Sequence, residues 1–499
     1  MNNSQNKFTD EYFNLHVKAK ILGQGGQGVV YRTTDPDVAL KLVTDESGNP
    51  ITNTEQISRY YRQLKNISLL PLPNNLNLAV PASLLKGQAG YVMRLLSEMV
   101  SFSSFWLNGD SSKKITSDDI PKWLSAMPED AAKQIVHYRN TGGLRRRLNA
   151  LYKCSAILAR LHGAGLVYGD ISPENVFIST DIKFSEVWFI DADNMRFDTG
   201  FRFGVYTPKY GAPELVQGIE GGSPRTDCHA FATMAFYLLS MIHPFIGKKV
   251  EDEDNTDADW ADDDFDEGDI EEKAYAGYLP WVDDNDDDSN SNTSGLPRTL
   301  VLTDHLMALF QQTFGEGRTA FWKRPAIYHW SQAFAAAADK TILCSSCECK
   351  MSFFVDYEGD TCPYCQTPKP TICLIQSYHW SGTDNLNLPC WTYTREFTGA
   401  NNVLTLPQRL FKTFSMTHSD NAVLELRFDD TKIHIKKLDD CDFALSVALN
   451  SENEHEFKPF SSQLELPISA LTTGLWLYAK GDEARLIKCS LIGAANGSK

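Results

Sequence analysis

Three polar residues in the middle of the sequence have types and spacing suited to chemistry on phosphoryl groups. Asp170 and Asn175 stand five residues apart in "LVYGDISPENVFI", and Asp191 ends the apolar run of "VWFIDADNM". In such a set the first Asp accepts or orients the proton of an attacking hydroxyl, while the Asn and the second Asp hold Mg²⁺. Each residue alone is explained as well by a turn that caps the next element. Their meaning depends on the elements around them.

A glycine-rich stretch near the N-terminus predicts a hairpin. "ILGQGGQGVVYR" holds G-x-G-x-x-G at Gly23, Gly25 and Gly28, followed by the β-branched Val29 and Val30. A dinucleotide-binding turn with the same spelling must open a helix. The β-branched residues favour a second strand instead, so the bare backbone would close over phosphates from a strand–loop–strand unit. A plain hairpin turn is the alternative.

A lysine inside an apolar strand follows this hairpin. Lys41 lies thirteen residues after Gly28, in "VALKLV". A buried amine is costly without a partner, and nucleotide phosphates together with a helix carboxylate would supply one. The next predicted helix, "TNTEQISRYYRQLKNI", has Thr52 or Asn53 as its cap and Glu55 as its only acid. Glu55 is therefore the expected partner of Lys41. A snorkelling edge-strand lysine is the alternative.

The glycine loop, the lysine, the two aspartates, the asparagine and the later "YGAPEL" occur in an order that resembles the bacterial eukaryotic-like (Hanks-type) Ser/Thr protein kinases, over about residues 15–338. The resemblance implies an α+β, bilobal kinase-like domain that transfers phosphate from ATP, with Mg²⁺, to Ser/Thr of protein substrates. The residues that it assigns to catalysis are Asp170, Lys41, Asn175 and Asp191. Those that it assigns to nucleotide are Gly23, Gly25, Gly28, Val30, Lys41, Glu55, Met93 and Leu95, and those that it assigns to Mg²⁺ are Asn175 and Asp191.

The same resemblance implies three supporting contacts. Asp227 would brace the catalytic loop, and Arg324 would pair with Glu214 of "APE". Thr207 would contact Asp170 and favour Ser/Thr acceptors. "GDISPEN", "HPFIG" and "YLPWVDD" are similar to kinases of tellurium-resistance-type gene clusters, which would make a von Willebrand A-domain protein and a metal-dependent phosphatase the expected partners.

Several positions depart from the kinase pattern. Tyr168 and Gly169 replace the His and Arg of the catalytic loop, Ser172 replaces a Lys, and Ala192-Asp193 replace Phe-Gly after the metal-binding Asp. None of these removes a group that does chemistry, so we expect an active kinase that needs no activation-loop phosphate. Loss of the Lys predicts a slower reaction. The alternatives are an ATP-binding pseudokinase scaffold and a small-molecule kinase of the same fold.

The acidity of the chain is local. The 499 residues carry a net charge of −17, but residues 251–288 hold 19 acids against one Lys, which leaves +1 elsewhere. We expect residues 251–296 to form a flexible, solvated insert, or a docking strip for a basic partner. Within it, "YLPWVDD" is apolar enough to anchor on the helical lobe. The sequence has no signal-peptide pattern and no apolar run long enough for a bilayer, which predicts a cytoplasmic protein without membrane contact.

Two C-x-x-C pairs lie beyond the kinase-like region. Cys344 and Cys347 are separated from Cys362 and Cys365 by fourteen residues, a spacing that predicts a tetrahedral Zn²⁺ ribbon over residues 341–369. Cys349 is expected to be an extra thiol outside the site. A redox pair or free thiols are the alternatives. No basic aromatic patch accompanies the cysteines, so we expect a spacer or protein contact and no nucleic-acid binding.

The last part of the chain reads as strands. Residues 373–497 hold period-2 runs such as "AVLELRF", "KIHIKKL", "FALSVAL" and "LWLYAK", separated by Asp, Asn and Gly. They predict a β-sandwich that serves as an interaction module. The motifs of forkhead-associated phosphopeptide modules are absent from this segment, and an immunoglobulin-like module fits equally well.

Overall fold

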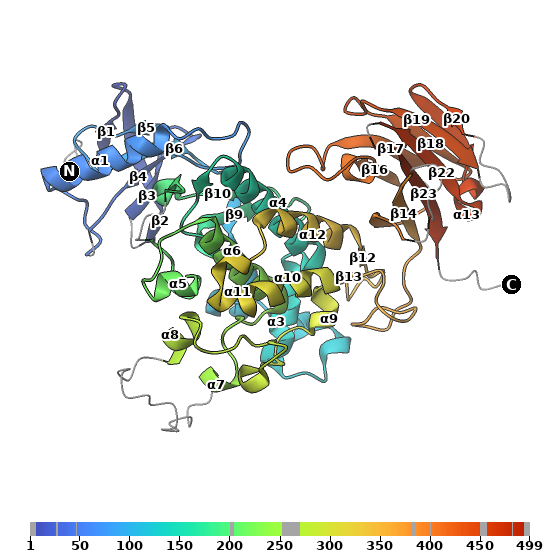
Figure 1. Cartoon of the computed structure of the whole chain (residues 1–499), viewed down its shortest axis with the longest axis horizontal. Helices are drawn as coiled ribbons and strands as arrows, with labels where there is room; N and C mark the ends of the chain where they lie inside the picture. The colour runs from blue at the N-terminus through green and yellow to red at the C-terminus, as the bar shows by residue number, and fades with distance from the viewer. Residues whose placement is uncertain are drawn as a thin grey trace.

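The computed structural model describes residues 6–493 except 26–27, 46, 200–203, 252–269, 381–385, 387, 400, 450–456 and 482. The chain runs from a small N-terminal lobe through a helical C-terminal lobe into a β-rich part, coloured blue, cyan to yellow, and orange to red (Figure 1). This is the mixed α and β architecture expected from the sequence.

The N-terminal lobe is an antiparallel sheet covered by one helix. Its strand order is β1-β2-β3-β4-β6-β5. Helix α1 (Thr54–Ser68) starts at Asn53, whose side chain accepts from the amides of Glu55 and Gln56, as one of the two predicted caps. The strands are β1 (Lys7–Thr9), β2 (Leu15–Gly25), β3 (Gly28–Thr33), β4 (Val38–Leu42), β5 (Ser83–Leu84) and β6 (Gly90–Arg94).

The C-terminal lobe is built around two long buried helices, α4 and α6. Ser223 caps α6 and Pro224 opens it, a favourable start because Pro has no amide hydrogen to leave unpaired. The helices are α2 (Gly109–Lys113), α3 (Glu129–Asn140), α4 (Gly143–Gly163), α5 (Pro213–Val216), α6 (Pro224–Ser240), α7 (Lys248–Glu251), α8 (Ile270–Tyr275), α9 (Arg298–Val301), α10 (Asp304–Phe314), α11 (Glu316–Thr319) and α12 (Ile327–Asp339). Short strands carry the loops that face the N-terminal lobe: β7 (Met99–Ser101), β8 (Leu166–Val167), β9 (Val176–Ser179), β10 (Val187–Phe189) and β11 (Arg196–Phe197).

Part of the acidic insert is packed rather than flexible. Trp281 and Val282 are buried in the C-terminal lobe, and Arg298 pairs with Asp283 at 2.7 Å. Asn290 is fully buried, and its side-chain amide donates to two backbone carbonyls. The expected anchoring of "YLPWVDD" is therefore confirmed. The expectation of a flexible insert is wrong for the other residues of 270–296, where Ala274 and Leu296 also join the core. Residues 252–269, which hold most of the acids, lie outside the described part of the chain.

Beyond α12 a small hairpin leads into two antiparallel sheets. Strands β12 (Thr341–Leu343) and β13 (Ser352–Phe354) form the hairpin. The four runs predicted as strands lie in β17, β18, β19 and β22. The six-stranded sheet has the order β15-β14-β23-β22-β19-β20, and the four-stranded sheet β16-β17-β18-β21. Their bounds are β14 (Ile372–His379), β15 (Trp391–Glu396), β16 (Val403–Pro407), β17 (Ala422–Phe428), β18 (Lys432–Lys437), β19 (Ala444–Leu449), β20 (Lys458–Pro459), β21 (Gln463–Pro467), β22 (Leu475–Lys480) and β23 (Arg485–Ile492), with α13 at Ser469–Thr473.

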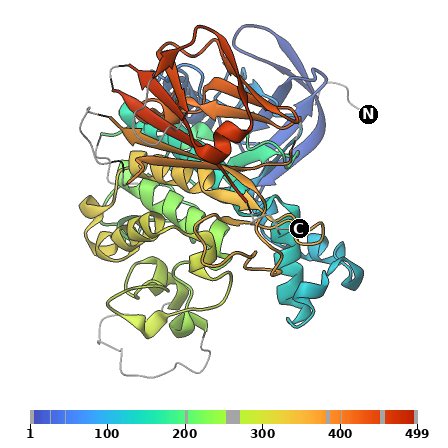
Figure 2. The ribbon, with the colours of Figure 1, turned by 90° about the vertical axis from the view of Figure 1, so that its right-hand side faces the viewer.

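These sheets are docked on the helical lobe (Figure 2). Asp339 at the end of α12 is fully buried and accepts from Trp391 Nε1 at 2.9 Å and from Arg409 at 2.7 and 2.8 Å. Arg145 of α4 reaches Glu396 of β15 at 2.6 Å. One apolar cluster runs from the helical lobe through the hairpin into both sheets. The C-terminal part is thus a fixed continuation of the helical lobe.

Candidate active site

A cleft of about 850 Å³ separates the two lobes. Its lining includes residues from β2, β3 and β4 above and from the loops around β9 and β10 below. The sequence-predicted residues that line it are Gly23, Gly28, Val30, Lys41, Met93, Leu95, Asp170, Asn175 and Asp191. Gly25 ends β2 and pairs with Gly28 across the hairpin. Of the predicted set for this site, Glu55 is the one residue that the structure places elsewhere.

The glycine-rich stretch forms the predicted hairpin. Strands β2 and β3 are antiparallel, and Val30 pairs with Lys41 of β4. Gly28 has φ +155°, and a Cβ there would lie 2.4 Å from the backbone oxygen of Leu42. Only glycine permits this close approach, which brings the hairpin down beside the strand that carries Lys41.

Asp170 and Asn175 lie together on the loop after β8. Asn175 Nδ2 donates to the backbone oxygen of Asp170 at 2.9 Å and to its carboxylate at 3.3 Å. Thr207 Oγ1 donates to Asp170 Oδ1 at 2.7 Å, the contact that the resemblance implies. Burial raises the pKa of Asp170 and nearby Asp191 adds to this rise, while the bond from Thr207 opposes it.

The substituted residues of this loop have structural reasons. Asp227 of α6 accepts from the amides of Tyr168 and Gly169 at 2.8 and 2.9 Å, which confirms the predicted brace. Tyr168 packs edge-on against Phe189 and donates to the carbonyl of Ile190, so it ties the loop to the end of β10. Gly169 has φ +92°, a conformation that favours glycine over the arginine usual in kinases.

A buried ion pair holds the segment around Glu214, which follows the catalytic loop in the sequence. Arg324 donates both terminal nitrogens to Glu214, at 2.6 and 2.8 Å. Arg324 also donates Nε to the carbonyl of Gly317 at 2.8 Å. The predicted Arg324–Glu214 pair is therefore present, with both side chains buried.

Lys41 has different partners from the one expected. Its amine contacts a carboxylate oxygen of Asp191 and lies 2.6 Å from Asp193 Oδ2. Burial lowers the pKa of Lys41, but the attraction of Asp193 and Asp191 outweighs burial and raises it, so the amine stays charged. Glu55 lies exposed in the first turn of α1. The expected Lys41–Glu55 pair is wrong because the first turn of α1 faces solvent.

Gln63 is the α1 side chain that reaches the loop beyond Asp191. Its Nε2 donates to the backbone oxygen of Asp193 at 2.9 Å. Sequence reasoning missed both Gln63 and the role of Asp193 as a partner of Lys41. A usable signal existed, because Asp193 adds an acid where the kinase pattern has glycine while the helix offers an acid only in its first turn.

A cysteine cluster lies beside the β12–β13 hairpin. The sulfurs of Cys344, Cys349, Cys362 and Cys365 all lie within 4.8 Å of one another. Cys344 and Cys365 are 3.5 Å apart, and Cys349 and Cys362 are 3.9 Å apart. Tetrahedral zinc with Zn–S bonds of about 2.3 Å requires sulfurs about 3.8 Å apart. Four thiol sulfurs at these separations fit a metal cation.

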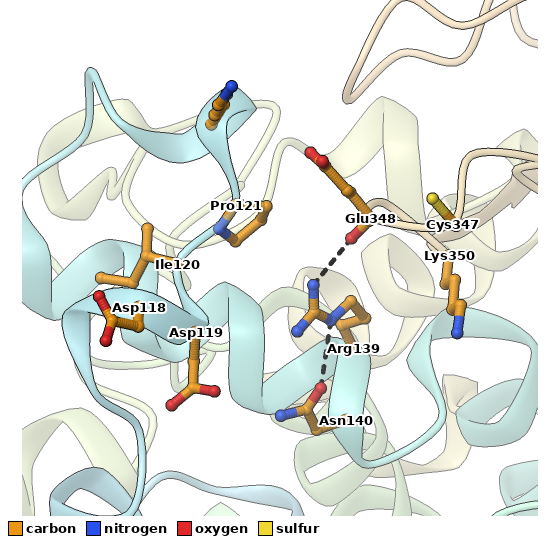
Figure 3. A pocket seen from close by; sticks show the side chains of 10 residues that line it. Asp118, Asp119, Ile120, Pro121, Arg139, Asn140, Cys347, Glu348 and Lys350 are labelled. Carbon is orange, nitrogen blue, oxygen red and sulfur yellow. Dashed lines mark hydrogen bonds between the residues drawn. The ribbon is translucent and has the colours of Figure 1, made fainter.

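The cluster corrects one predicted ligand. Cys347 is exposed and lines a neighbouring pocket of about 510 Å³ beside Glu348 and Lys350, where Arg139 donates to the Glu348 carbonyl at 2.8 Å (Figure 3). Cys349, expected to be an extra thiol, is buried in the cluster instead. The turn after Cys344 is two residues longer than the C-x-x-C pattern assumed, so Cys349 and not Cys347 faces the other three cysteines.

Part of the chain is similar in sequence to known protein kinases. The serine/threonine-protein kinase PknD of Chlamydia abortus is 23% identical over 254 residues, which cover 46% of this chain and 24% of PknD. PkaB of Streptomyces coelicolor, also named a serine/threonine-protein kinase, is 25% identical over 245 residues, 46% of this chain and 49% of PkaB. The serine/threonine-protein kinase pkn2 of Myxococcus xanthus is 30% identical over 110 residues, 20% of this chain and 13% of pkn2. The chain is related to serine/threonine-protein kinases.

The match covers only part of each protein. This chain spans about a quarter of the length of PknD and about half that of PkaB. No protein-family model matches it. Within the described residues, no helix has the length and apolar character needed to cross a bilayer.

Proposed function

We propose that this chain is an ATP- and Mg²⁺-dependent serine/threonine protein kinase. The observation that carries the proposal is the meeting of Lys41, Asp170, Asn175 and Asp191 in one cleft between the lobes. These residues come from distant parts of the sequence, and each has the type that phosphoryl transfer requires. The related kinases support the same reaction class.

The cleft is lined by both kinds of group that a nucleotide requires. Val30, Ala39 and Met93 give it an apolar lining, which suits a purine ring. The charged Lys41 would contact the phosphates. The hairpin around Gly28 would close over them from above.

The cleft also has oxygen ligands for Mg²⁺ beside Lys41. Asn175 uses its amide nitrogen on Asp170, which leaves the amide oxygen for a cation, and Asp191 supplies a carboxylate. Oxygen ligands are those that Mg²⁺ prefers. When bound, the metal would neutralise charge on the phosphates. Asp170, oriented by Thr207, would receive the proton of the acceptor hydroxyl.

Ser172 is a further candidate for contact with the transferred group. It lines the cleft, is 1% exposed, and its hydroxyl has no hydrogen-bond partner among the described residues. A buried hydroxyl without a partner is costly. A phosphoryl oxygen or the acceptor would provide that partner, in place of the lysine usual in kinases.

The test is phosphotransfer from labelled ATP with Mg²⁺. Acceptors would include the chain itself, a von Willebrand A-domain protein and a metal-dependent phosphatase as candidate partners. We expect incorporation on Ser or Thr that falls to background in Asp191→Ala. Equal incorporation in both proteins would contradict the proposal. ATP binding without transfer would favour the pseudokinase scaffold.

We further propose a structural Zn²⁺ ion bound by Cys344, Cys349, Cys362 and Cys365. The support is the four-sulfur geometry given above, which suits a closed tetrahedral site. In this proposal residues 341–369 form a zinc ribbon that joins the kinase domain, residues 15–338, to an interaction module of residues 373–497, built as a β-sandwich.

A further inference from the structure

The carboxylate that holds Lys41 comes from an unexpected element. Asp193 lies in the short 3₁₀ turn Ala192–Asn194, directly after Asp191. Its side chain is 11% exposed and that of Lys41 is 5% exposed, so their contact of 2.6 Å is shielded from water. An ion pair in such surroundings is stronger than one at the surface.

Helix α1 presents a neutral side chain to the same place. Gln63 lies eight residues after Glu55 and donates to the backbone oxygen of Asp193 at 2.9 Å. The amide of Gln63 therefore holds the turn that carries Asp193. Helix α1 therefore positions the turn through Gln63, and the turn supplies the negative charge beside Lys41.

Without Asp193, Asp191 would have to ligate Mg²⁺ and hold Lys41 at the same time. In the proposed function it ligates Mg²⁺, and in this structure it also contacts Lys41. Its backbone is left-handed, with φ 57° and ψ 49°, and the turn that follows brings the Asp193 carboxylate to the same amine. A second carboxylate would keep Lys41 in place while a cation engages Asp191.

We infer that Asp193 is the positioning residue for Lys41, in the role that a glutamate of the N-terminal-lobe helix has in other kinases. This inference rests on the proposed function. It has a regulatory consequence, because the lysine is held by the turn that bears the metal ligand. Outward movement of α1 would then break the Gln63 contact and leave the Lys41–Asp193 ion pair within the turn.

The experiment uses the full chain with four changes: Asp193→Asn, Asp193→Gly, Asp193→Gly with Gln63→Glu, and Glu55→Gln. Two readouts are measured: the affinity for a fluorescent ADP analogue in EDTA, which needs neither metal nor turnover, and kcat and KM for ATP. Thermal unfolding checks that each protein is folded.

We expect Asp193→Asn and Asp193→Gly to weaken nucleotide binding or lower kcat/KM by about tenfold or more. Glu55→Gln should stay within about twofold, since an exposed carboxylate has little influence on the site. Adding Gln63→Glu to Asp193→Gly should restore a clear part of the loss, because it returns a carboxylate to the helix position that faces the turn.

The inference is overturned if Asp193→Asn binds nucleotide and turns over as the parent does. It is also overturned if a folded Asp193→Gly loses function and Gln63→Glu restores none of it, since Asp193 would then act only through the shape of the turn. If Asp193→Asn does not fold, the comparison of Asp193→Gly with and without Gln63→Glu tests the inference instead, because kinases carry glycine at this position. A chain that transfers no phosphate but shows the affinity pattern would refute the proposed function and support this inference.

Discussion

Individual residues explain why the catalytic loop departs from the kinase pattern without losing its geometry. Tyr168 and Gly169 keep the loop on Asp227 through their amides, a contact that depends on the backbone and not on the replaced side chains. Gly169 adopts a left-handed conformation in which an arginine would be strained. The substitutions therefore fit the local backbone, while Asp170 and Asn175 keep their mutual hydrogen bonds.

Ser172→Ala gives a prediction at this scale. Removal of a buried hydroxyl that has no partner among the described residues should raise the free energy of unfolding by about 1 kcal/mol. The same change should lower kcat, since the hydroxyl is proposed to meet the reacting groups. Denaturant unfolding and steady-state kinetics on one preparation measure the expected gain in stability and the expected loss of kcat. A stabilised protein with unchanged kcat would remove Ser172 from the proposed chemistry.

At the scale of elements, the β12–β13 hairpin and its cysteines join the helical lobe to the sheets. Phe353 and Cys349 are fully buried, and Ser352 Oγ accepts from the amide of Arg145 in α4 at 2.9 Å. The segment is too short to have a core of its own. Its stability therefore depends on α4 and on the proposed metal.

Metal analysis tests this element. We expect about one zinc per purified chain. Cys349→Ser should lose the metal, whereas Cys347→Ser should keep it, since Cys347 is exposed. Chelation should increase proteolysis within residues 341–369, because metal binding in small zinc modules contributes about 10–16 kcal/mol. Loss of zinc in Cys347→Ser but not in Cys349→Ser would contradict the assignment of the cluster.

At the scale of the whole molecule, the C-terminal sheets and the helical lobe act as one body. Asp339 and Arg409 form a buried pair between them, and Trp391 adds a third hydrogen bond. Burial lowers the pKa of Arg409, but the attraction of Asp339 outweighs burial and raises it, so the pair is ionised. On the side of the helical lobe, α12 and α4 both contact the sheets, through Asp339 and Arg145.

Asp339→Ala tests this junction. The change leaves the guanidinium of Arg409 buried without its main partner, which should lower the free energy of unfolding by about 3–5 kcal/mol. Glu465→Gln, which breaks the exposed pair with Lys432, should cost less than about 1 kcal/mol. Urea unfolding of the full chain measures both. Equal effects would show that the junction does not hold the two parts together.

The sequence by itself determined the order of the functional motifs and much of the secondary structure. The glycine hairpin and the runs that became β17, β18, β19 and β22 were predictable, because residue types and periodicity are properties of the chain itself. The Arg324–Glu214 pair was implied by the resemblance to kinases.

Only the tertiary structure decided which groups meet. Lys41 and Asp193 are 152 positions apart, and their contact depends on how two lobes close and how a short turn points its side chains. Cys349 rather than Cys347 turns inward for the same kind of reason, since a difference of two residues in a tight turn reverses the direction of a side chain. The predicted partner of Lys41, Glu55, was wrong because the sequence shows which acids a helix carries but not how the helix is rotated against the sheet.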